Sequence, residues 1–244
     1  ALRGLRRVNR ISRTAASLWA PLRALANTPG HGPVSLLDIA TGSGDIPIAL
    51  ARHAARDNIN LLLTGCDVSE RAIATARDRA VAAGVSVEFL CVDAIRDPVP
   101  GDYDVVTCCL FMHHLDVEDA IALLYKMRAA ARRMVLVSDL RRSAAGLRLA
   151  WLATRLGSRS RVVRTDALLS VRAAFTIEEF EAVAAWAGPR GPDRPPPPAP
   201  RQWRMRRASR ARRSGPAGPS GFCWSGAAHE QHGSERRRPG IISG

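Results

Sequence analysis

The sequence predicts a doubly wound α/β domain, with a mostly parallel sheet and helices on both faces. From residue 34 onward, short and nearly continuous apolar runs alternate with helical patterns, which is typical of parallel strands that are buried on both sides. The first run ends in a turn of small residues, Ala40-Thr41-Gly42-Ser43-Gly44, before a helical pattern begins. A glycine turn between a strand and a helix brings backbone N–H groups close to a nucleotide-like ligand.

The individual elements follow from the same pattern. We expect strands rich in Val, Leu or Cys at 34–39, 60–66, 86–91, 103–109 and 133–139. We expect helices at 46–57, 69–83, 117–130, 143–156 and 176–187. Ser69 and Thr176 are expected to cap two of these helices. Right-handed crossovers between parallel strands then place the ligand at the carboxyl edge of the sheet.

Residues 1–29 are predicted to form an amphipathic helical lid ahead of the main domain. Leucines and other apolar residues alternate with arginines between residues 3 and 26, which fits one or two helices. Such a segment is a solvated basic helix, a lid over the ligand site, or a peripheral contact with an anionic membrane surface. No apolar run in the chain reaches the length of a membrane span.

The net charge of +14 is concentrated at the two ends of the chain. Residues 1–29 carry six arginines and no acid, residues 189–244 carry twelve arginines and three acids, and 30–188 has a balance of −1. Only one of the 36 basic residues, Lys126, is a lysine, a bias that indicates a GC-rich genome rather than a selected binding surface. We therefore expect no specific nucleic-acid partner.

Five cysteines without a C-x-x-C pair indicate neither a disulfide framework nor a metal site. The histidines and acids do not form a spaced metal motif either. This usage of cysteine favours a reducing, cytoplasmic compartment.

Residues 189–244 differ from the rest of the chain. They hold ten of the sixteen prolines and show no plausible strand. Their composition predicts a disordered tail, and it also suits an out-of-frame translation of GC-rich DNA. The main domain is accordingly placed at 30–188.

An acid ends the second predicted strand, at Asp67, about 25 residues beyond the glycine turn. Folds that bind dinucleotides place their ribose-binding acid near this interval. Three more segments follow the turn in chain order, and each contains an acid and part of a predicted strand. With the turn itself, the four segments are Leu37–Asp45, Gly65–Ser69, Phe89–Ala94 and Tyr103–Thr107.

These four segments make residues 34–140 similar to the class I S-adenosylmethionine-dependent methyltransferases, with a weaker likeness to residue 187. Within that family the chain resembles the small-molecule branch that includes ubiquinone and menaquinone C-methyltransferases. Dinucleotide binding becomes the second interpretation, because Ala40 interrupts the usual glycine triplet.

The resemblance implies S-adenosylmethionine as cofactor, with contacts in each segment. Gly42 and Gly44 would let the backbone approach the amino-acid part of the cofactor, and Ala40 stands where the family usually has glycine. Asp38 would organise the turn and reach the methionyl ammonium, directly or through water. Asp67 would accept hydrogen bonds from the ribose hydroxyls, and Asp93 would accept one from the adenine amino group. The other expected contacts are Val68, Ala94, Cys109 and Phe111. Taken singly, Asp67 could instead cap helix 69–83 and Asp93 could form a turn.

The segment after the fourth strand, Cys109 to Leu115, matches the place where the family lines the cofactor and the acceptor pocket. His113 and His114 are the candidate catalytic residues, since a histidine could orient or deprotonate an acceptor; a structural role for one of them fits equally well. Methyl transfer from a sulfonium depends mainly on alignment and desolvation. The expected acceptor is a small aromatic or lipid-like molecule. The apolar residues of 141–175 could either cover this acceptor or simply complete the core.

Two alternatives to an active small-molecule methyltransferase stay open. The family normally ends in two hairpin strands that 189–244 do not resemble, which would leave a cofactor-binding but catalytically impaired protein with an exposed sheet edge. The other alternative is an RNA- or DNA-modifying methyltransferase that uses the Arg-rich ends. Cys108-Cys109-Leu110-Phe111 stands where amino-methylating DNA enzymes carry an Asn/Asp-Pro-Pro-aromatic motif, which argues against that function.

Overall fold

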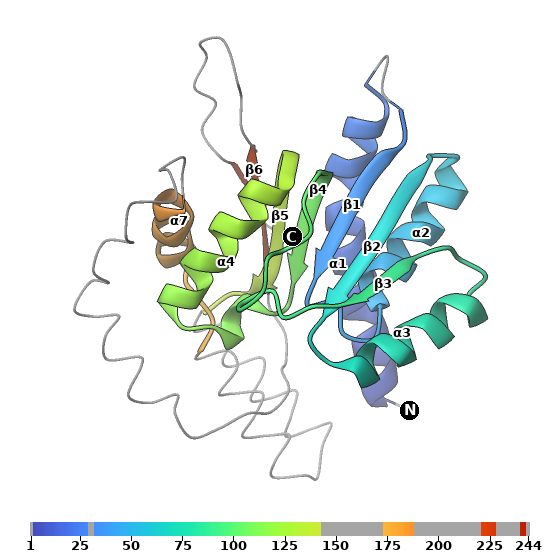
Figure 1. Ribbon diagram of the computed structural model, residues 1–244, viewed down its shortest axis with the longest axis horizontal. Coiled ribbons are helices and arrows are strands. Elements are labelled where there is room, and N and C mark those ends of the chain that lie inside the picture. The colour runs from blue at the N-terminus through green and yellow to red at the C-terminus, as the bar shows by residue number, and fades with distance from the viewer. Residues whose placement is uncertain (1, 29–31, 143–172, 188–220, 228–239, 243–244) are drawn as a thin grey trace.

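The computed structural model of the protein describes residues 2–28, 32–142, 173–187, 221–227 and 240–242. Figure 1 shows a central twisted sheet with helices on either side. In chain order the elements are α1 (Leu2–Ala26), β1 (Val34–Ile39), α2 (Asp45–Asp57), β2 (Leu61–Asp67), α3 (Glu70–Ala82), β3 (Glu88–Cys91), β4 (Tyr103–Cys109), the 3-10 turn η1 (Met112–His114), α4 (Val117–Ala130), β5 (Ala131–Leu140), α7 (Ile177–Trp186), β6 (Gly221–Ala227) and β7 (Gly240–Ile242).

The sheet has the strand order β3-β2-β1-β4-β5-β6-β7. The first five strands in the chain are parallel, with β1 between β2 and β4. The predicted doubly wound α/β fold is therefore confirmed. Ile39, the last residue of β1, lies opposite Cys66 of β2 and Cys108 of β4. The winding reverses between β1 and β4, and open α/β sheets bind their ligands at the carboxyl ends of strands at such a point.

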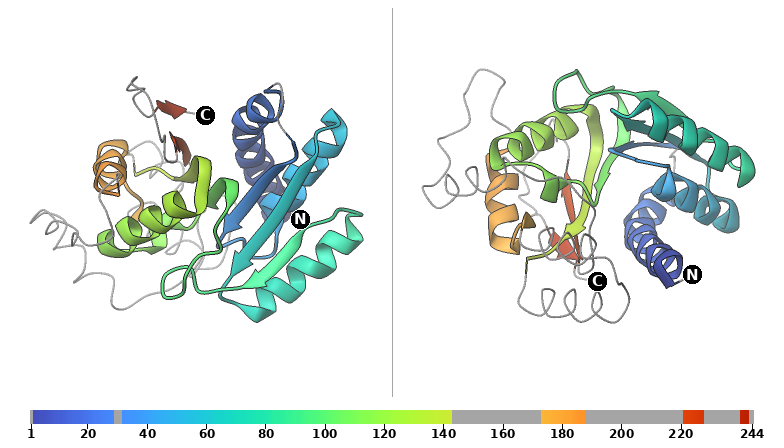
Figure 2. Two further views of the ribbon diagram at one scale, coloured as in Figure 1. Left: turned by 45° about the horizontal axis from the view of Figure 1, so that its top comes forward. Right: turned by 90° about the horizontal axis from the view of Figure 1, so that it is seen from below.

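Helices cover both faces of the sheet, as Figure 2 shows. On one face, buried side chains of α4 and α7 pack on Leu37, Val106 and Cys108. On the other face, α1 and α2 pack on Leu36, Val105 and their neighbours. α3 joins that second face through a smaller cluster with α2 and β3. Alternate residues of β1 and β4 thus face opposite layers, which explains why these strands are apolar throughout.

The second half of α1 is part of this core. Ala15, Leu18, Trp19 and Leu22 are buried against α2 and the sheet. Trp19 Nε1 donates a hydrogen bond of 2.8 Å to Asp57 Oδ2, at the end of α2. Whether residues 1–29 also form a lid or touch a membrane stays a prediction. In the described part of the chain, none of the helices is long and apolar enough to cross a bilayer.

The expectation that 189–244 contains no strand is wrong at two places. β6 pairs antiparallel with β5, from Met134 opposite Ala227 to Leu140 opposite Gly221, and β7 pairs antiparallel with β6. The hairpin strands expected to be missing are therefore present at the edge of the sheet. Their signal is weak because one short apolar run, Phe222-Cys223-Trp224, lies between glycine-rich segments that disfavour strands. The rest of 189–244 lies outside the described residues.

Most predicted helices and caps agree with the structure. The Ser69 side chain accepts a hydrogen bond from the Ala72 N–H at the start of α3. Thr176 and Glu179 form a reciprocal capping box at the start of α7. The helix expected at 143–156, and with it the apolar cover expected from 141–175, falls almost entirely outside the described residues.

Candidate functional site

The turn between β1 and α2 has three residues with positive φ: Ala40 at 55°, Gly42 at 56° and Gly44 at 73°. The two glycines are needed for different reasons. A Cβ on Gly44 would lie 2.9 Å from Cζ of Phe89, so packing alone excludes a side chain there. A Cβ on Gly42 would meet no heavy atom within 4 Å. The backbone of Gly42 is therefore open to an approaching ligand.

Asp38 lies under this turn and is 1% exposed. Its two carboxylate oxygens accept hydrogen bonds from the hydroxyls of Thr41 at 2.7 Å and Thr107 at 2.8 Å. Burial raises the pKa of Asp38 to about 6 against the effect of these hydroxyls. The site thus holds a carboxyl group that is ionised near neutral pH and that a cation would stabilise in that form.

Asp67, at the end of β2, connects the turn to the neighbouring strand. Its Oδ2 accepts the Gly42 N–H at 2.8 Å, and its Oδ1 accepts the Ser69 N–H at 2.9 Å. The interpretation of Asp67 as the cap of α3 is wrong, because Ser69 caps that helix. Val68 follows with its side chain 63% exposed. A carboxylate and an exposed apolar side chain therefore stand side by side at the edge of the sheet.

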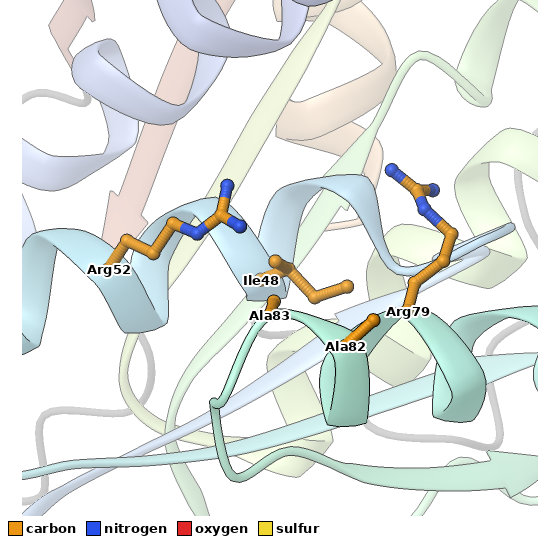
Figure 3. Close-up of a pocket in the computed structure, with 5 residues that line it drawn as sticks. All are labelled: Ile48, Arg52, Arg79, Ala82 and Ala83. Carbon is orange, nitrogen blue, oxygen red and sulfur yellow. The ribbon is translucent and has the colours of Figure 1, made fainter.

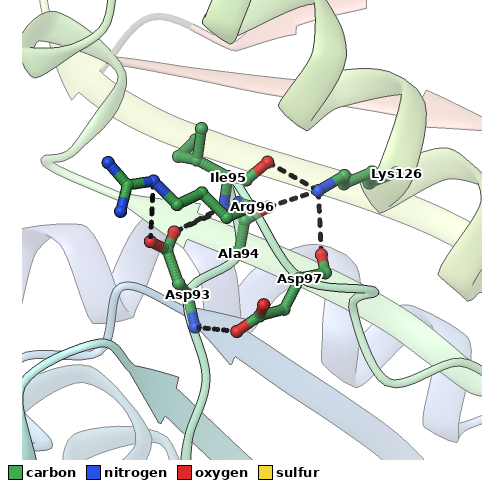
Figure 4. Close-up of polar contacts among 6 residues, drawn as sticks. All are labelled: Asp93, Ala94, Ile95, Arg96, Asp97 and Lys126. Carbon is green, nitrogen blue, oxygen red and sulfur yellow. Dashed lines mark hydrogen bonds and ion pairs between the residues drawn. The ribbon is translucent and has the colours of Figure 1, made fainter.

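Asp93 organises the loop that follows β3 (Figure 4). Its Oδ1 accepts the N–H groups of Ile95 at 3.0 Å and Arg96 at 3.2 Å. The interpretation of Asp93 as a turn former is therefore confirmed. Its contact with adenine stays a prediction. Ala94 is buried beside it.

The segment after β4 separates the two candidate histidines. His113 is buried. Its backbone N–H donates to Asp139 Oδ2 at 2.8 Å, and its ring Nδ1 lies 2.5 Å from Asp139 Oδ1. His114 is exposed, and its ring centroid lies 4.1 Å from that of His113. Phe111 packs partly against the core and lies 6.3 Å from His114, measured between ring centroids. A substrate outside the core can thus reach His114 more readily than His113.

Residues 36–133 match the family model described as a methyltransferase domain. The matched region is less than half of the chain. The resemblance to class I methyltransferases, drawn from the four segments, is confirmed by this match and by the relatives that follow.

The methyltransferase domain is similar to enzymes of quinone biosynthesis. The demethylmenaquinone methyltransferase of Thermus thermophilus is 33% identical over 132 residues, which cover 53% of this chain and 58% of that protein. The ubiquinone biosynthesis O-methyltransferase of Pseudomonas aeruginosa is 32% identical over 99 residues, which cover 39% of this chain and 40% of that protein. The chain spans about half the length of the curated relatives it matches.

A solved structure shares the fold. Magnesium protoporphyrin IX methyltransferase from Synechocystis, crystallised with S-adenosylhomocysteine, superposes with a TM-score of 0.52 at 23% identity. The superposition covers 72% of each chain. It supports the Rossmann-like methyltransferase fold of this domain.

A shallow cavity of about 220 Å³ lies between α2 and α3 of the methyltransferase domain (Figure 3). Arg79, one of its lining residues, donates from Nη1 to the Ser43 carbonyl oxygen at 2.8 Å and pairs with Asp45. None of the predicted site residues lines this cavity. We place the functional site at the carboxyl edge instead, because the turn, Asp67 and the end of β4 meet there. The full lining of the cavity is Ile48, Arg52, Arg79, Ala82 and Ala83.

Two side chains at this edge were missed by sequence reasoning. Thr107 lies in the predicted strand 103–109, and its hydroxyl donates a hydrogen bond to Asp38. Asp139 is the penultimate residue of β5; an acid near the end of a predicted strand, like Asp67 in β2, was a usable signal. The structure brings Asp38 and Asp67 to the same turn, because Thr41 binds Asp38 and Gly42 binds Asp67. Cys109 is buried at the end of β4, where Leu110 N–H donates to the Ser138 carbonyl oxygen at 2.8 Å.

Among the described residues, no group of three or more His, Cys, Asp or Glu side chains is placed to hold a metal ion.

Proposed function

We propose that this chain binds S-adenosylmethionine at the carboxyl edge of β1, β2 and β4, and that it methylates a small aromatic or quinone-like acceptor. The observation that supports this most is the contact of Asp67 with the Gly42 N–H at 2.8 Å. It joins the glycine turn to the acid of the next strand, so that both lie at one edge of the sheet.

The residues at the edge fit the parts of such a cofactor. Asp38 would favour the methionyl ammonium, because a nearby cation stabilises its buried carboxylate. The open backbone of Gly42 would lie against the amino-acid part, and Asp67 would accept the ribose hydroxyls. Val68 and Ala94 would flank the adenine, and Asp93 would lie near its amino group. When bound, the cofactor would supply an electrophilic methyl group.

The acceptor side of the site is formed by the segment after β4. We place Phe111 and Cys109 between cofactor and acceptor, and His114 where it could accept a proton from an acidic acceptor. His113, buried with Asp139, would hold that segment in position. An aromatic or quinone-like acceptor agrees with the quinone enzymes named above, whose domain this chain resembles.

Calorimetric titration with S-adenosylhomocysteine tests the cofactor site. We expect the wild-type protein to bind and Asp67→Ala to bind at least tenfold more weakly, since a hydrogen bond to a charged group contributes about 1.5–3 kcal/mol. A matched control is Asp78→Ala, which removes an exposed acid from α3. Absence of wild-type binding would reject the proposed function, and equal binding by Asp67→Ala would reject the ribose assignment.

Turnover is tested separately. The protein would be incubated with S-adenosylmethionine and a demethylated naphthoquinol, and release of S-adenosylhomocysteine would be followed. Release that requires the acceptor supports methyl transfer. Binding without release over a range of quinol and phenol acceptors would favour the cofactor-binding protein without turnover.

A further inference from the structure

The loop that follows β3 is held by a single cation, which comes from α4. Lys126 lies on α4, and its Nζ donates to the carbonyl oxygens of Ala94 at 3.1 Å, Ile95 at 2.7 Å and Asp97 at 2.8 Å. Figure 4 shows the three carbonyl groups converging on the ammonium. An ammonium has three N–H donors and no acceptor. The three carbonyl groups of the loop therefore use all the hydrogen-bond donors of Lys126.

The same loop satisfies its N–H groups from within. Asp93 accepts from the N–H groups of Ile95 and Arg96, and its own N–H donates to Asp97 Oδ2 at 3.2 Å. Carboxylates thus bind the N–H groups of Asp93, Ile95 and Arg96, while Lys126 binds the carbonyl groups of Ala94, Ile95 and Asp97. Removing the ammonium would free one of these two sets and leave the loop less ordered.

The geometry calls for a lysine rather than an arginine. A guanidinium presents its donors in a flat fork, whereas an ammonium is a compact donor whose three N–H bonds can point at three converging carbonyl groups. The chain otherwise uses arginine at every basic position. Its one lysine stands where three carbonyl oxygens meet.

We infer that Lys126 is a positioning residue that fixes the 93–97 loop in the shape that receives the adenosine half of the cofactor. The inference rests on the proposed function, because it takes Asp93 and Ala94 as the adenine contacts. Lys126 does not touch the ligand itself. It keeps the loop ordered before binding, so less conformational freedom is lost when the ligand binds.

The first test needs no ligand. Hydrogen exchange of the Arg96 and Asp97 amides, which donate to the Asp93 carbonyl oxygen at 3.1 and 2.7 Å, would be compared in the wild type, Lys126→Met and Arg128→Met. Methionine keeps the apolar stem and removes the charge. Arg128 lies two residues further along the same helix and points to a different side. We expect faster exchange in Lys126→Met alone, and unchanged exchange in that variant would overturn the clamp.

The second test measures ligand affinity well below the unfolding temperature. We expect Lys126→Met to weaken S-adenosylhomocysteine and methylthioadenosine by the same factor, roughly 5- to 30-fold for a lost set of charged hydrogen bonds. The equal factor follows because both ligands carry the adenosine half. Lys126→Arg should restore less than half of the loss on a logarithmic scale, and Arg128→Met should bind like the wild type.

The outcomes separate the two claims. A wild type that binds neither ligand would reject the proposed function, while the exchange result would still decide whether Lys126 orders the loop. A wild type that binds, together with a Lys126→Met variant that melts earlier but binds equally well, would leave only a structural role and overturn the inference. In turnover, the positioning role predicts a raised KM for S-adenosylmethionine with kcat unchanged at saturation.

Discussion

Asp139 accepts two hydrogen bonds from His113, one from its N–H at 2.8 Å and one at its Nδ1 at 2.5 Å, inside a region that solvent does not reach. The pair joins the end of β5 to η1, the turn that carries His114. These contacts hold η1 against the end of β5. The two histidines, equivalent in the sequence, thus have different surroundings in the fold.

Replacing Asp139 should destabilise the protein strongly. Asp139→Ala leaves the His113 N–H, its imidazole and the Leu140 N–H without their acceptor. We expect the free energy of unfolding to fall by about 3 kcal/mol, which is typical when one member of a buried polar pair is removed. Urea denaturation measures this. A loss below about 1 kcal/mol would contradict the importance of the pair.

His114→Ala should separate catalysis from stability. His114 is exposed, so its removal should change the free energy of unfolding by no more than about 0.5 kcal/mol. If His114 accepts the acceptor's proton, kcat should fall by roughly 10²- to 10⁴-fold, with S-adenosylhomocysteine affinity unchanged. A variant that keeps its kcat would remove His114 from the catalytic residues.

The two glycines of the turn allow a matched comparison. Gly44→Ala places a Cβ 2.9 Å from the Phe89 ring, and the overlap should lower the free energy of unfolding by about 2 kcal/mol. Gly42→Ala meets no neighbour, and Ala40 already shows an alanine at nearly the same φ in this turn. We expect it to cost only about 1 kcal/mol yet to weaken S-adenosylhomocysteine more than tenfold by occupying the open space.

Calorimetric titration and thermal unfolding of both variants distinguish the two effects. If Gly42→Ala bound the ligand as well as the wild type, the open space beside Gly42 would not belong to the cofactor site.

Local features of this fold were predictable from the sequence. The bounds of β1, β4 and α4 agree with expectation, because apolar runs there end at turn residues or at a cap such as Asp116. The glycine turn and Asp67 were recognisable because each lies directly after an apolar run. Such signals need only a few neighbouring residues.

Features that depend on distant partners were not predictable. β6 becomes a strand because the edge of β5 is available to it, although the two are far apart in the chain. Asp139 and Lys126 show their roles only when the fold brings them to His113 and to the loop after β3. No local pattern marks such side chains, since their partners are set by packing.

The raised pKa of Asp38 predicts a pH dependence of stability. Its pKa is about 6 in the folded protein, above the ordinary value of 3.8, so the folded state holds the proton more tightly. The associated stabilisation is complete below pH 3.8 and is lost as the pH rises through 6. From pH 5 to 8 the wild type should lose about 1.4 kcal/mol relative to Asp38→Asn. Denaturant unfolding of both proteins at the two pH values measures the difference, and an unchanged difference would contradict the raised pKa.

The same group should make ligand binding pH-dependent. An ionised Asp38 favours the ammonium of S-adenosylhomocysteine, so affinity should fall about tenfold from pH 7.5 to pH 5. Methylthioadenosine lacks that ammonium and should show little change. Equal pH profiles for the two ligands would place the ammonium elsewhere.

Trp19 tests whether α1 belongs to the core of the domain. Trp19→Phe keeps an aromatic ring against His53, where the Trp19 ring stacks at a centroid distance of 5.6 Å, and removes the hydrogen bond to Asp57. We expect it to lower the free energy of unfolding by about 1 kcal/mol. Trp19→Ala also removes buried apolar area and should lower it by about 3 kcal/mol or more.

Deleting residues 1–12 is the matched control for α1, because the buried contacts from Thr14 to Leu22 stay in the chain. That deletion should leave the thermal transition within a few degrees of the wild type, whereas deleting 1–28 should uncover Leu36, Val105 and Leu136 and cause aggregation. A lid function for the first residues would appear as lost turnover in the shorter deletion at unchanged stability. If the chain without 1–28 folded as stably as the wild type, α1 would be an appendage rather than a layer of the domain.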